Sequence, residues 1–256
     1  MILKVLGSGS CIVAQERTSS GYILQANDSV LMIDTGTGTT DALRRAGINT
    51  DDIDAVVNTH RHPDHISDLV PIIQDKIVRS FQDEEPEIKL LGPEGHTDYL
   101  ESRIFHEMKE DIHEFDDLFD FQVSIAELEQ VSEVKDIDIQ VFDADHGPEG
   151  FKCVSLKFEA DKTIFFTGDT DFFEGLVENA AGADMIVADC SKPDEEKVEG
   201  HMTPSECGKL AQRADTDKLV LSHLYPEAEA SDIRDSAQEH FEGDILVAED
   251  LKEFEV

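Results

Sequence analysis

Cysteine is scarce in this sequence, and long apolar runs, repeats and proline-rich linkers are missing from it. The four cysteines, Cys11, Cys153, Cys190 and Cys207, stand singly, so we expect structural thiols in a reducing cytoplasm and no disulfide framework. No stretch approaches the roughly 20 apolar residues of a membrane span, and the first ten residues resemble a strand and a turn, not a signal peptide. We therefore expect a cytoplasmic protein, and its 256 residues predict one domain over 1–256.

Positive charge is scarce as well. Lys and Arg total 21 against 58 Asp and Glu, which gives a formal net charge of −37. The acidic residues are spread along the chain, as is typical of a solvated acidic surface. Such a surface suggests a saline cytoplasm, because salt at 1 M shortens the Debye length to about 3 Å. Since a long RNA needs clustered basic residues, extended nucleic acid is a poor partner, although high salt would mute the repulsion.

The sequence does contain a histidine cluster, in a chain with only ten histidines. His60, His62, Asp64 and His65 lie within six positions, directly after an apolar run. Chance, a surface loop or a histidine-rich tract would be simpler explanations, but histidine is sparse elsewhere and a dry core does not accept unpartnered imidazoles. Neutral imidazole and carboxylate are the usual ligands of catalytic zinc. The cluster therefore predicts a metal site.

Three further candidate ligands follow strand-like apolar runs. They are His146, Asp169 and His223. Strand ends can direct side chains from distant segments at one point, and the resulting seven ligands suffice for two metals roughly 3.5–4 Å apart. Cys190 is not counted among the ligands. The other histidines discussed are interpreted as residues on helix surfaces: His96, His106, His113 and His240.

The local patterns alternate between strands and helices, as in a mixed α/β domain. Strands are expected within 1–10, on both sides of Asn27–Asp28, and at 53–60, 88–93, 136–146, 151–160, 162–170 and 218–223, the last clear strand. Helices are expected at 39–46, at 65–77 with a bend at Pro71, at 96–119, and at 203–214 behind a capping box. The helical pattern at 96–119 is open to three interpretations: a face for a homodimer, a lid, or packed core.

The order of the motifs resembles the metallo-β-lactamase superfamily. "LGSGS", "LMIDTG", "THRHPDH", His146 after a strand, "FTGDT" and "LSHLYP" follow one another along nearly the whole chain. The resemblance implies an α/β fold, a four-layer αββα sandwich of mixed sheets, with a dinuclear site at one edge between the sheets. It also implies the ligand sets: His60, His62 and His146 for one metal, Asp64, His65 and His223 for the other, and Asp169 as the bridge.

Within that superfamily, the segment from residue 199 to 226 is most similar to the phosphodiesterase branch that includes ribonuclease Z. A histidine at this place acts on the leaving group there, so the resemblance makes His201 the candidate general acid; alternatively it only covers the start of a helix. The family's "HEAT"-like stretch appears here as Asp189-Cys190-Ser191, and Asp189 could be the acidic partner. Only 22 residues separate His146 from Asp169, too few for the family's long tRNA-binding arm.

We therefore predict a metal-dependent hydrolase, namely a dinuclear zinc phosphodiesterase for a small phosphodiester or an RNA end. Two cations would lower the pKa of a bridging water, Asp64 would orient that water or take its proton, and His201 would protonate the leaving alkoxide. Manganese or iron shares these ligands. Three alternatives stay open: a thioesterase or lactonase, a ribonuclease Z-like enzyme for tRNA 3′ ends, and a metal binder without activity.

Overall fold

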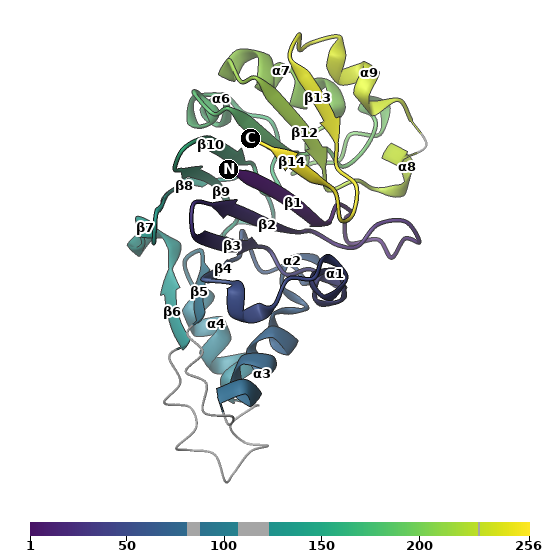
Figure 1. Ribbon diagram of the computed structural model, residues 1–256. Coiled ribbons are helices and arrows are strands. Elements are labelled where there is room, and N and C mark those ends of the chain that lie inside the picture. The colour runs from purple at the N-terminus through teal and green to yellow at the C-terminus, as the bar shows by residue number, and fades with distance from the viewer. Residues whose placement is uncertain (81–87, 107–122, 230) are drawn as a thin grey trace.

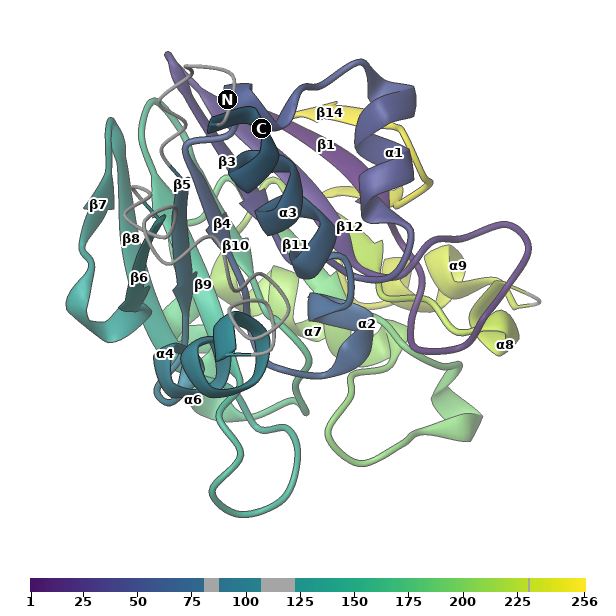
Figure 2. The same ribbon diagram turned by 90° about the horizontal axis from the view of Figure 1, so that it is seen from below.

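Two seven-stranded sheets lie face to face at the centre of the molecule, and helices cover the outer face of each (Figure 1, Figure 2). The computed structural model describes residues 1–80, 88–106, 123–229 and 231–256. Both sheets contain parallel and antiparallel strand pairs. This is the αββα sandwich of mixed sheets that the resemblance to the metallo-β-lactamase superfamily implies.

The first sheet is antiparallel on one side and parallel on the other. Its strands, in spatial order, are β14 (Glu253–Glu255), β1 (Ile2–Gly7), β2 (Gly21–Ala26), β3 (Ser29–Ile33), β4 (Ala55–Val57), β5 (Ile88–Gly92) and β6 (Val123–Glu127). The pairs from β14 to β3 are antiparallel, and those from β3 to β6 are parallel. The histidine cluster begins in the loop that follows β4.

The second sheet has the same division into a parallel and an antiparallel half. Its strands, in spatial order, are β13 (Asp244–Val247), β12 (Lys218–Ser222), β11 (Met185–Asp189), β10 (Thr163–Phe166), β9 (Val154–Glu159), β8 (Ile137–Asp143) and β7 (Glu133–Val134). The pairs from β13 to β10 are parallel, and those from β10 to β7 are antiparallel. Strands β8, β10 and β12 therefore run in the same direction, so the loops after their carboxyl ends lie at one edge of the sheet.

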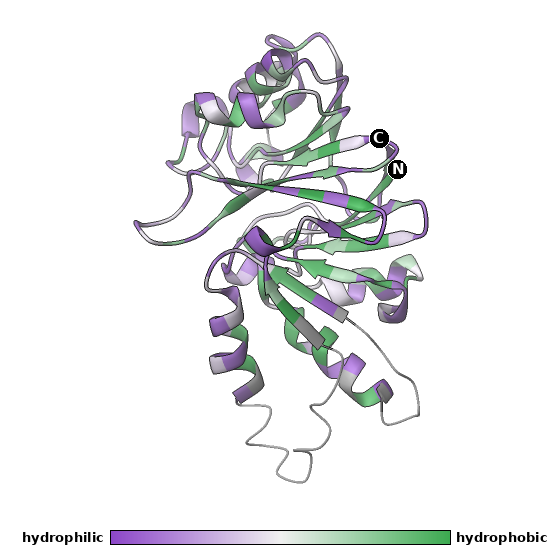
Figure 3. Ribbon diagram, turned by 90° about the vertical axis from the view of Figure 1, so that its left-hand side faces the viewer, coloured by the Kyte–Doolittle hydropathy of each residue, from purple (hydrophilic) through white to green (hydrophobic). Residues whose placement is uncertain are grey.

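Three layers of buried apolar side chains hold the sandwich together, and Figure 3 shows the strands as its most hydrophobic parts. One layer fills the space between the sheets. The other two pack helices on the outer faces: α1 (Thr39–Ala46), α3 (Leu69–Ser80) and α4 (His96–Tyr99) on the first sheet, and α6 (Glu174–Ala180), α7 (Pro204–Ala214) and α9 (Ile233–Gln238) on the second. The described part of the chain also contains the short helices α2 (Pro63–Ile66) and α8 (Pro226–Glu229). None of the helices seen in the described ranges is long and apolar enough to cross a membrane.

Local sequence signals explain several boundaries. Helix α7 begins with the predicted capping box, in which Thr203 and Glu206 bond each other's backbone and Pro204 occupies the first turn. Helix α1 ends at Gly47, which has a left-handed φ of 71° that glycine adopts without strain. The turn between β2 and β3 places Asn27 at a φ of 51°, a conformation that asparagine tolerates well. These three predictions are confirmed.

Three expectations about secondary structure need correction. The helix expected at 65–77 is divided into α2 and α3, and Pro71 causes no break because it lies in the first turn of α3, where its missing N–H has no partner to lose. Residues 218–223 are not the last strand, since the short β13 and β14 follow. In the pattern at 96–119, α4 continues as a π-helix, η2 (Leu100–Phe105), and residues 107–119, including His113, lie outside the described residues.

His96 is a further correction, because it is fully buried and not on a helix surface. Its ring lies over Gly92, where an added Cβ would come within 2.2 Å of His96 Cγ. The absence of a side chain at Gly92 therefore makes room for the imidazole beneath α4. Burial, and the charge of Arg61 beside it, lower the pKa of His96 to about 4, so the ring is neutral at ordinary pH.

Carboxylates cover the surface of the described structure, and only four aspartates are buried within it: Asp34, Asp64, Asp169 and Asp189. All other described acidic residues keep some contact with solvent. With a net charge of −37, mutual repulsion among these groups opposes the compact state.

We therefore expect the protein to become more stable as salt rises. Between about 0.1 M and about 2 M KCl, where the Debye length falls below about 3 Å, the melting temperature should rise by roughly 5–10 °C, equivalent to about 2–3 kcal/mol for a chain of this size. Thermal unfolding followed by circular dichroism measures the change, and sucrose serves as an uncharged control solute. A melting temperature that stays flat or falls with KCl would contradict the expectation.

Candidate metal centre

All seven ligands predicted from the sequence meet at one edge of the sandwich, between the two sheets. His60 and His62 lie in the loop after β4, and Asp64 and His65 lie on α2. The second sheet supplies the rest, because the loops after β8, β10 and β12 carry His146, Asp169 and His223. Neither sheet alone provides a full ligand set.

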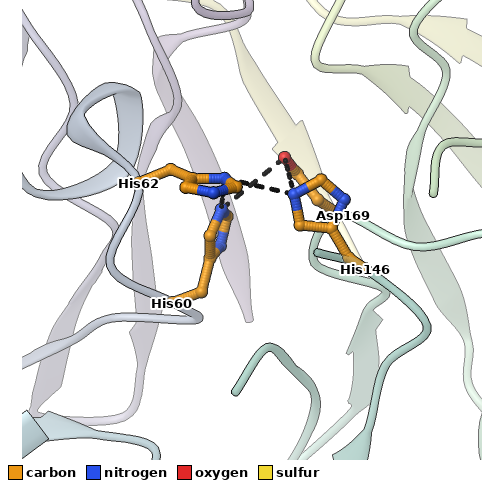
Figure 4. Close-up of side chains that lie close together, drawn as sticks. All are labelled: His60, His62, His146 and Asp169. Atoms are coloured by element: carbon orange, nitrogen blue, oxygen red, sulfur yellow. Dashed lines mark hydrogen bonds and ion pairs between the residues drawn. The ribbon is translucent and has the colours of Figure 1, made fainter. Parts of the chain in front are cut away.

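The first group consists of His60, His62, His146 and Asp169 (Figure 4), with one ligand atom from each lying within 4.8 Å of all the others. Nδ1 of His62 is 3.0 Å from His60 Nε2 and 3.1 Å from His146 Nε2. Asp169 Oδ2 lies 3.7 Å and 3.9 Å from the same two Nε2 atoms. Tetrahedral ligands on zinc, with bonds of about 2.0–2.1 Å, lie about 3.3 Å apart, so this group fits one cation.

The second group consists of Asp64, His65 and His223. Asp64 Oδ2 lies 3.7 Å from His65 Nε2 and 3.5 Å from His223 Nε2. Asp169 reaches this group too, since its carboxylate oxygens are 3.4 Å from both Nε2 atoms. His65 Nε2 is buried and makes no hydrogen bond within the described part of the chain, as expected of a lone pair that a cation would use. The residues present therefore fit a second cation, with Asp169 between the two groups.

Four of the five histidines in the two groups contact a neighbouring protein group through their other ring nitrogen, a common arrangement at metal sites. Nδ1 of His65 is 2.7 Å from Asp34 Oδ2, and Nδ1 of His146 is 2.9 Å from the Gly200 carbonyl. Asp34 also accepts from the backbone and hydroxyl of Thr59, whose Oγ1 is 3.0 Å from His60 Nδ1. Asp34 thus positions ligands of both groups.

Asp34 was missed as a site residue, although it lies within the motif "LMIDTG". It has a φ of 55°, in the left-handed region that few residues other than glycine, asparagine and aspartate adopt and that is common at functional sites. Phe151 was missed as well: its ring stacks on His62 with the centroids 4.6 Å apart. A loop aromatic has no sequence signal that distinguishes it from a core residue.

The carboxylates change the pKa values of the second group. Burial alone would lower the pKa of His65, but Asp169 and Asp34 raise it to about 10. Burial is likewise outweighed at His223, where Asp169 and Asp189 hold the pKa well above its ordinary value. Burial would raise the pKa of Asp169, but His223 and His65 keep it well below its usual range. In the absence of a cation, the raised pKa values favour protons on His65 and His223, which then balance the negative charge of the neighbouring carboxylates.

Cation binding should therefore release protons. Because carboxylates raise the pKa of both His65 and His223, we expect both rings to be protonated at neutral pH in the cation-free protein, so that a divalent cation displaces about two protons. We expect its affinity to rise with pH from 6 towards 10 and to fall as the pH drops. Calorimetric titration with zinc in buffers of different ionisation enthalpy counts the protons. The variant His65→Ala should release about one fewer, and a heat independent of the buffer would contradict the expectation.

His201 lies beside the metal ligands and is 8% exposed. Its Nδ1 is 2.8 Å from Asp189 Oδ2, so the structure provides the acidic partner considered from the sequence. Burial would lower the pKa of His201, but Asp189 raises it. The ring stacks on that of His223 at 5.4 Å and lies 4.7 Å from that of His146. The ring of His201 thus lies against the rings of one candidate ligand from each group.

Other predicted features can be placed as well. Residues 147–168 contain β9 and β10, which leaves no room for a long arm, as expected. Cys190 is buried in the apolar layer beneath α7 and belongs to neither ligand group. Its predicted exclusion from the ligand set agrees with the geometry.

Comparisons with known proteins agree with this structure. Residues 1–243 match the family described as anti-Pycsar protein Apyc1. Ribonuclease Z of Haloferax volcanii is 24% identical over an alignment that covers 98% of this chain and 93% of that protein. The probable metallo-hydrolase YhfI of Bacillus subtilis is 24% identical, with 97% of each chain covered.

Solved structures show the same fold. The crystal structure of YhfI superposes with a TM-score of 0.82 at 22% identity, covering 100% of this chain and 99% of that one. The short form of human tRNase Z superposes with a TM-score of 0.75 at 19% identity, again covering 100% and 99%. With the family match and the histidine–carboxylate groups, these likenesses show that the chain belongs to the anti-Pycsar protein Apyc1 family and is a metallo-hydrolase of the metallo-β-lactamase superfamily.

Proposed function

We propose that this protein is a phosphodiesterase that hydrolyses a small phosphodiester, such as a cyclic nucleotide, with two divalent cations, zinc being the first candidate. One observation carries the proposal: His201, paired with Asp189 at 2.8 Å, lies beside the ligands of both groups. A proton donor in this place suits an ester whose leaving group is a strongly basic alkoxide, because such a group departs slowly without a proton.

The roles of the side chains follow from their contacts. Bound cations would supply Lewis-acid activation of water and would neutralise charge on the phosphoryl oxygens. Asp64, at the rim of the second group, would orient the attacking water and accept its proton. His201 uses Nδ1 to bind Asp189, which leaves Nε2 to give a proton to the departing alkoxide. Asp189 raises the pKa of His201 against the effect of burial, and this favours the protonated ring.

A small substrate is favoured over a long nucleic acid. The net charge of −37 opposes the many phosphate contacts that a long RNA requires. The strands at 147–168 occupy the place where a tRNA-binding arm would be inserted. One phosphodiester needs only the local positive charge of the site. The similarity to proteins named ribonuclease Z keeps RNA-end processing at high salt as the alternative.

A substrate panel tests the proposal. The purified protein, with its metal content measured by elemental analysis, is assayed with 3′,5′-cyclic nucleotides, bis(p-nitrophenyl) phosphate, a tRNA precursor and an acyl thioester, in low and high KCl. We expect cyclic nucleotide hydrolysis and about two cations per chain. Turnover of the thioester alone would overturn the proposal in favour of the thioesterase alternative. Cleavage of the tRNA precursor without turnover of the small esters would favour the ribonuclease.

A further inference from the structure

We infer that Ser191 is a positioning residue that ties the metal ligand His223 to the proton donor His201 through the carboxylate of Asp189; the part concerning His201 rests on the proposed function. Ser191 follows β11 and is 1% exposed. Its hydroxyl therefore has only protein groups as partners, and the structure identifies three of them.

The contacts of the hydroxyl define the link. Ser191 Oγ donates to Asp189 Oδ1 at 2.6 Å. The same oxygen lies 3.0 Å from His223 Nδ1 and 3.1 Å from His201 Nδ1. The direct distance from His223 Nδ1 to Asp189 Oδ1 is longer, at 3.3 Å. Ser191 is thus the nearer partner of His223, whereas Asp189 is the nearer partner of His201.

Hydrogen-bond chemistry gives this arrangement one consistent direction. A carboxylate only accepts, so the hydroxyl proton of Ser191 points to Asp189 and the oxygen is left to accept. His223 then donates Nδ1–H to Ser191, and His201 donates Nδ1–H to Asp189. His223 is thereby held in the tautomer whose Nε2 lone pair is directed at the cation. His201, with Nδ1–H bound to Asp189, carries its second proton on Nε2, the proton it would give to the leaving group. One hydroxyl therefore supports both functions of the site.

Removing the hydroxyl should disturb both histidines. In Ser191→Ala, His223 Nδ1–H has only the more distant Asp189 Oδ1 left and would draw the carboxylate away from His201. No volume is added, so packing is preserved. Outer partners of metal-ligating histidines typically contribute 10–100-fold in metal affinity. We expect a loss of that size in cation affinity, together with a weaker proton donor.

Three variants test the inference: Ser191→Ala, Ser191→Thr, and Ser155→Ala as a matched control. Ser155 is also buried, but its hydroxyl donates to the backbone carbonyl of Thr167, away from both histidines. The measurements are zinc affinity against a chelator, thermal unfolding, and kcat for a cyclic nucleotide and for bis(p-nitrophenyl) phosphate. p-Nitrophenolate leaves readily without a proton, so only the cyclic nucleotide reports on His201.

We expect Ser191→Ala to bind zinc about 10–100-fold more weakly and, at saturating zinc, to lose about tenfold more kcat on the cyclic nucleotide than on the nitrophenyl ester. Ser191→Thr should restore both, and Ser155→Ala should change neither. Unchanged zinc affinity in Ser191→Ala, or equal losses on the two esters, would overturn the inference. If the wild-type protein hydrolysed neither ester, the proposed function would fail, and zinc affinity alone would decide the link to His223.

Discussion

Replacing Asp169 with asparagine is expected to empty the site of cations and to lower phosphodiester hydrolysis by on the order of 10³-fold or more, because Lewis-acid activation worth several kcal/mol is lost. The oxygens of Asp169 lie within 3.4–3.9 Å of imidazole nitrogens in both ligand groups. An amide keeps the shape of the side chain but removes the charge that both groups share. Elemental analysis and kcat for a cyclic nucleotide measure the two effects.

A second aspartate provides the control for this variant. Asp184 accepts from Lys162 and from the backbone of Thr163, away from the site. Asp184→Asn should therefore keep its metal and its activity, with at most a modest loss of stability. If Asp169→Asn retained two cations and near-normal turnover, Asp169 would not be the bridge between the groups.

The second large effect concerns the proton donor. His201→Ala is expected to lower kcat for a cyclic nucleotide by roughly 10²–10⁴, the usual contribution of general acid catalysis, while bound metal stays nearly unchanged. On an ester with a nitrophenolate leaving group, which departs without a proton, the loss should be much smaller. Paired kcat values and metal contents of wild-type and variant protein measure this difference.

His240 offers a matched histidine for comparison, since it lies near the end of α9, outside the ligand groups. His240→Ala should leave both rates unchanged. Loss of metal in His201→Ala would contradict the assignment, because it would make His201 a ligand instead of a proton donor. An equal loss of rate on both esters would show that His201 does not act on the leaving group.

The candidate ligands could be identified from the sequence because their signal is local. His60, His62, Asp64 and His65 lie within six consecutive positions, and His146 and His223 each follow an apolar strand. Periodicity and strand ends are properties of short windows, and the structure brings all these residues to one edge. Their roles as ligands stay a prediction until cations are measured.

The residues that orient the ligands were much harder to predict. Asp34 contacts His65 across 31 positions of sequence, and Ser191 contacts His223 across 32. Such pairs depend on how the sheets pack, and neither an aspartate in a chain with 58 acidic residues nor a lone serine is unusual. The burial of His96 was missed for a related reason, since it depends on the space above Gly92.

Short strands were missed because local patterns are weak over few residues. β13 and β14 have four and three residues, and both contain acidic residues that suggest loop. Their place is set by partners: β13 pairs with β12, and β14 returns to pair with β1 at the opposite end of the sequence. Hydrogen bonding to the edge of a sheet, and not the side-chain pattern, therefore determines that these two segments form strands.

The division of the ligands between the two sheets has a consequence for how the protein matures. His60 and His62 belong to the N-terminal half of the chain, whereas His146 and Asp169 belong to the C-terminal half. A cation held by both halves would therefore gain its full coordination only after the halves have docked. Such a cation would also act as a reversible cross-link between the two sheets. Scarcity of metal would then weaken the packing of the two halves of the chain as well as the activity.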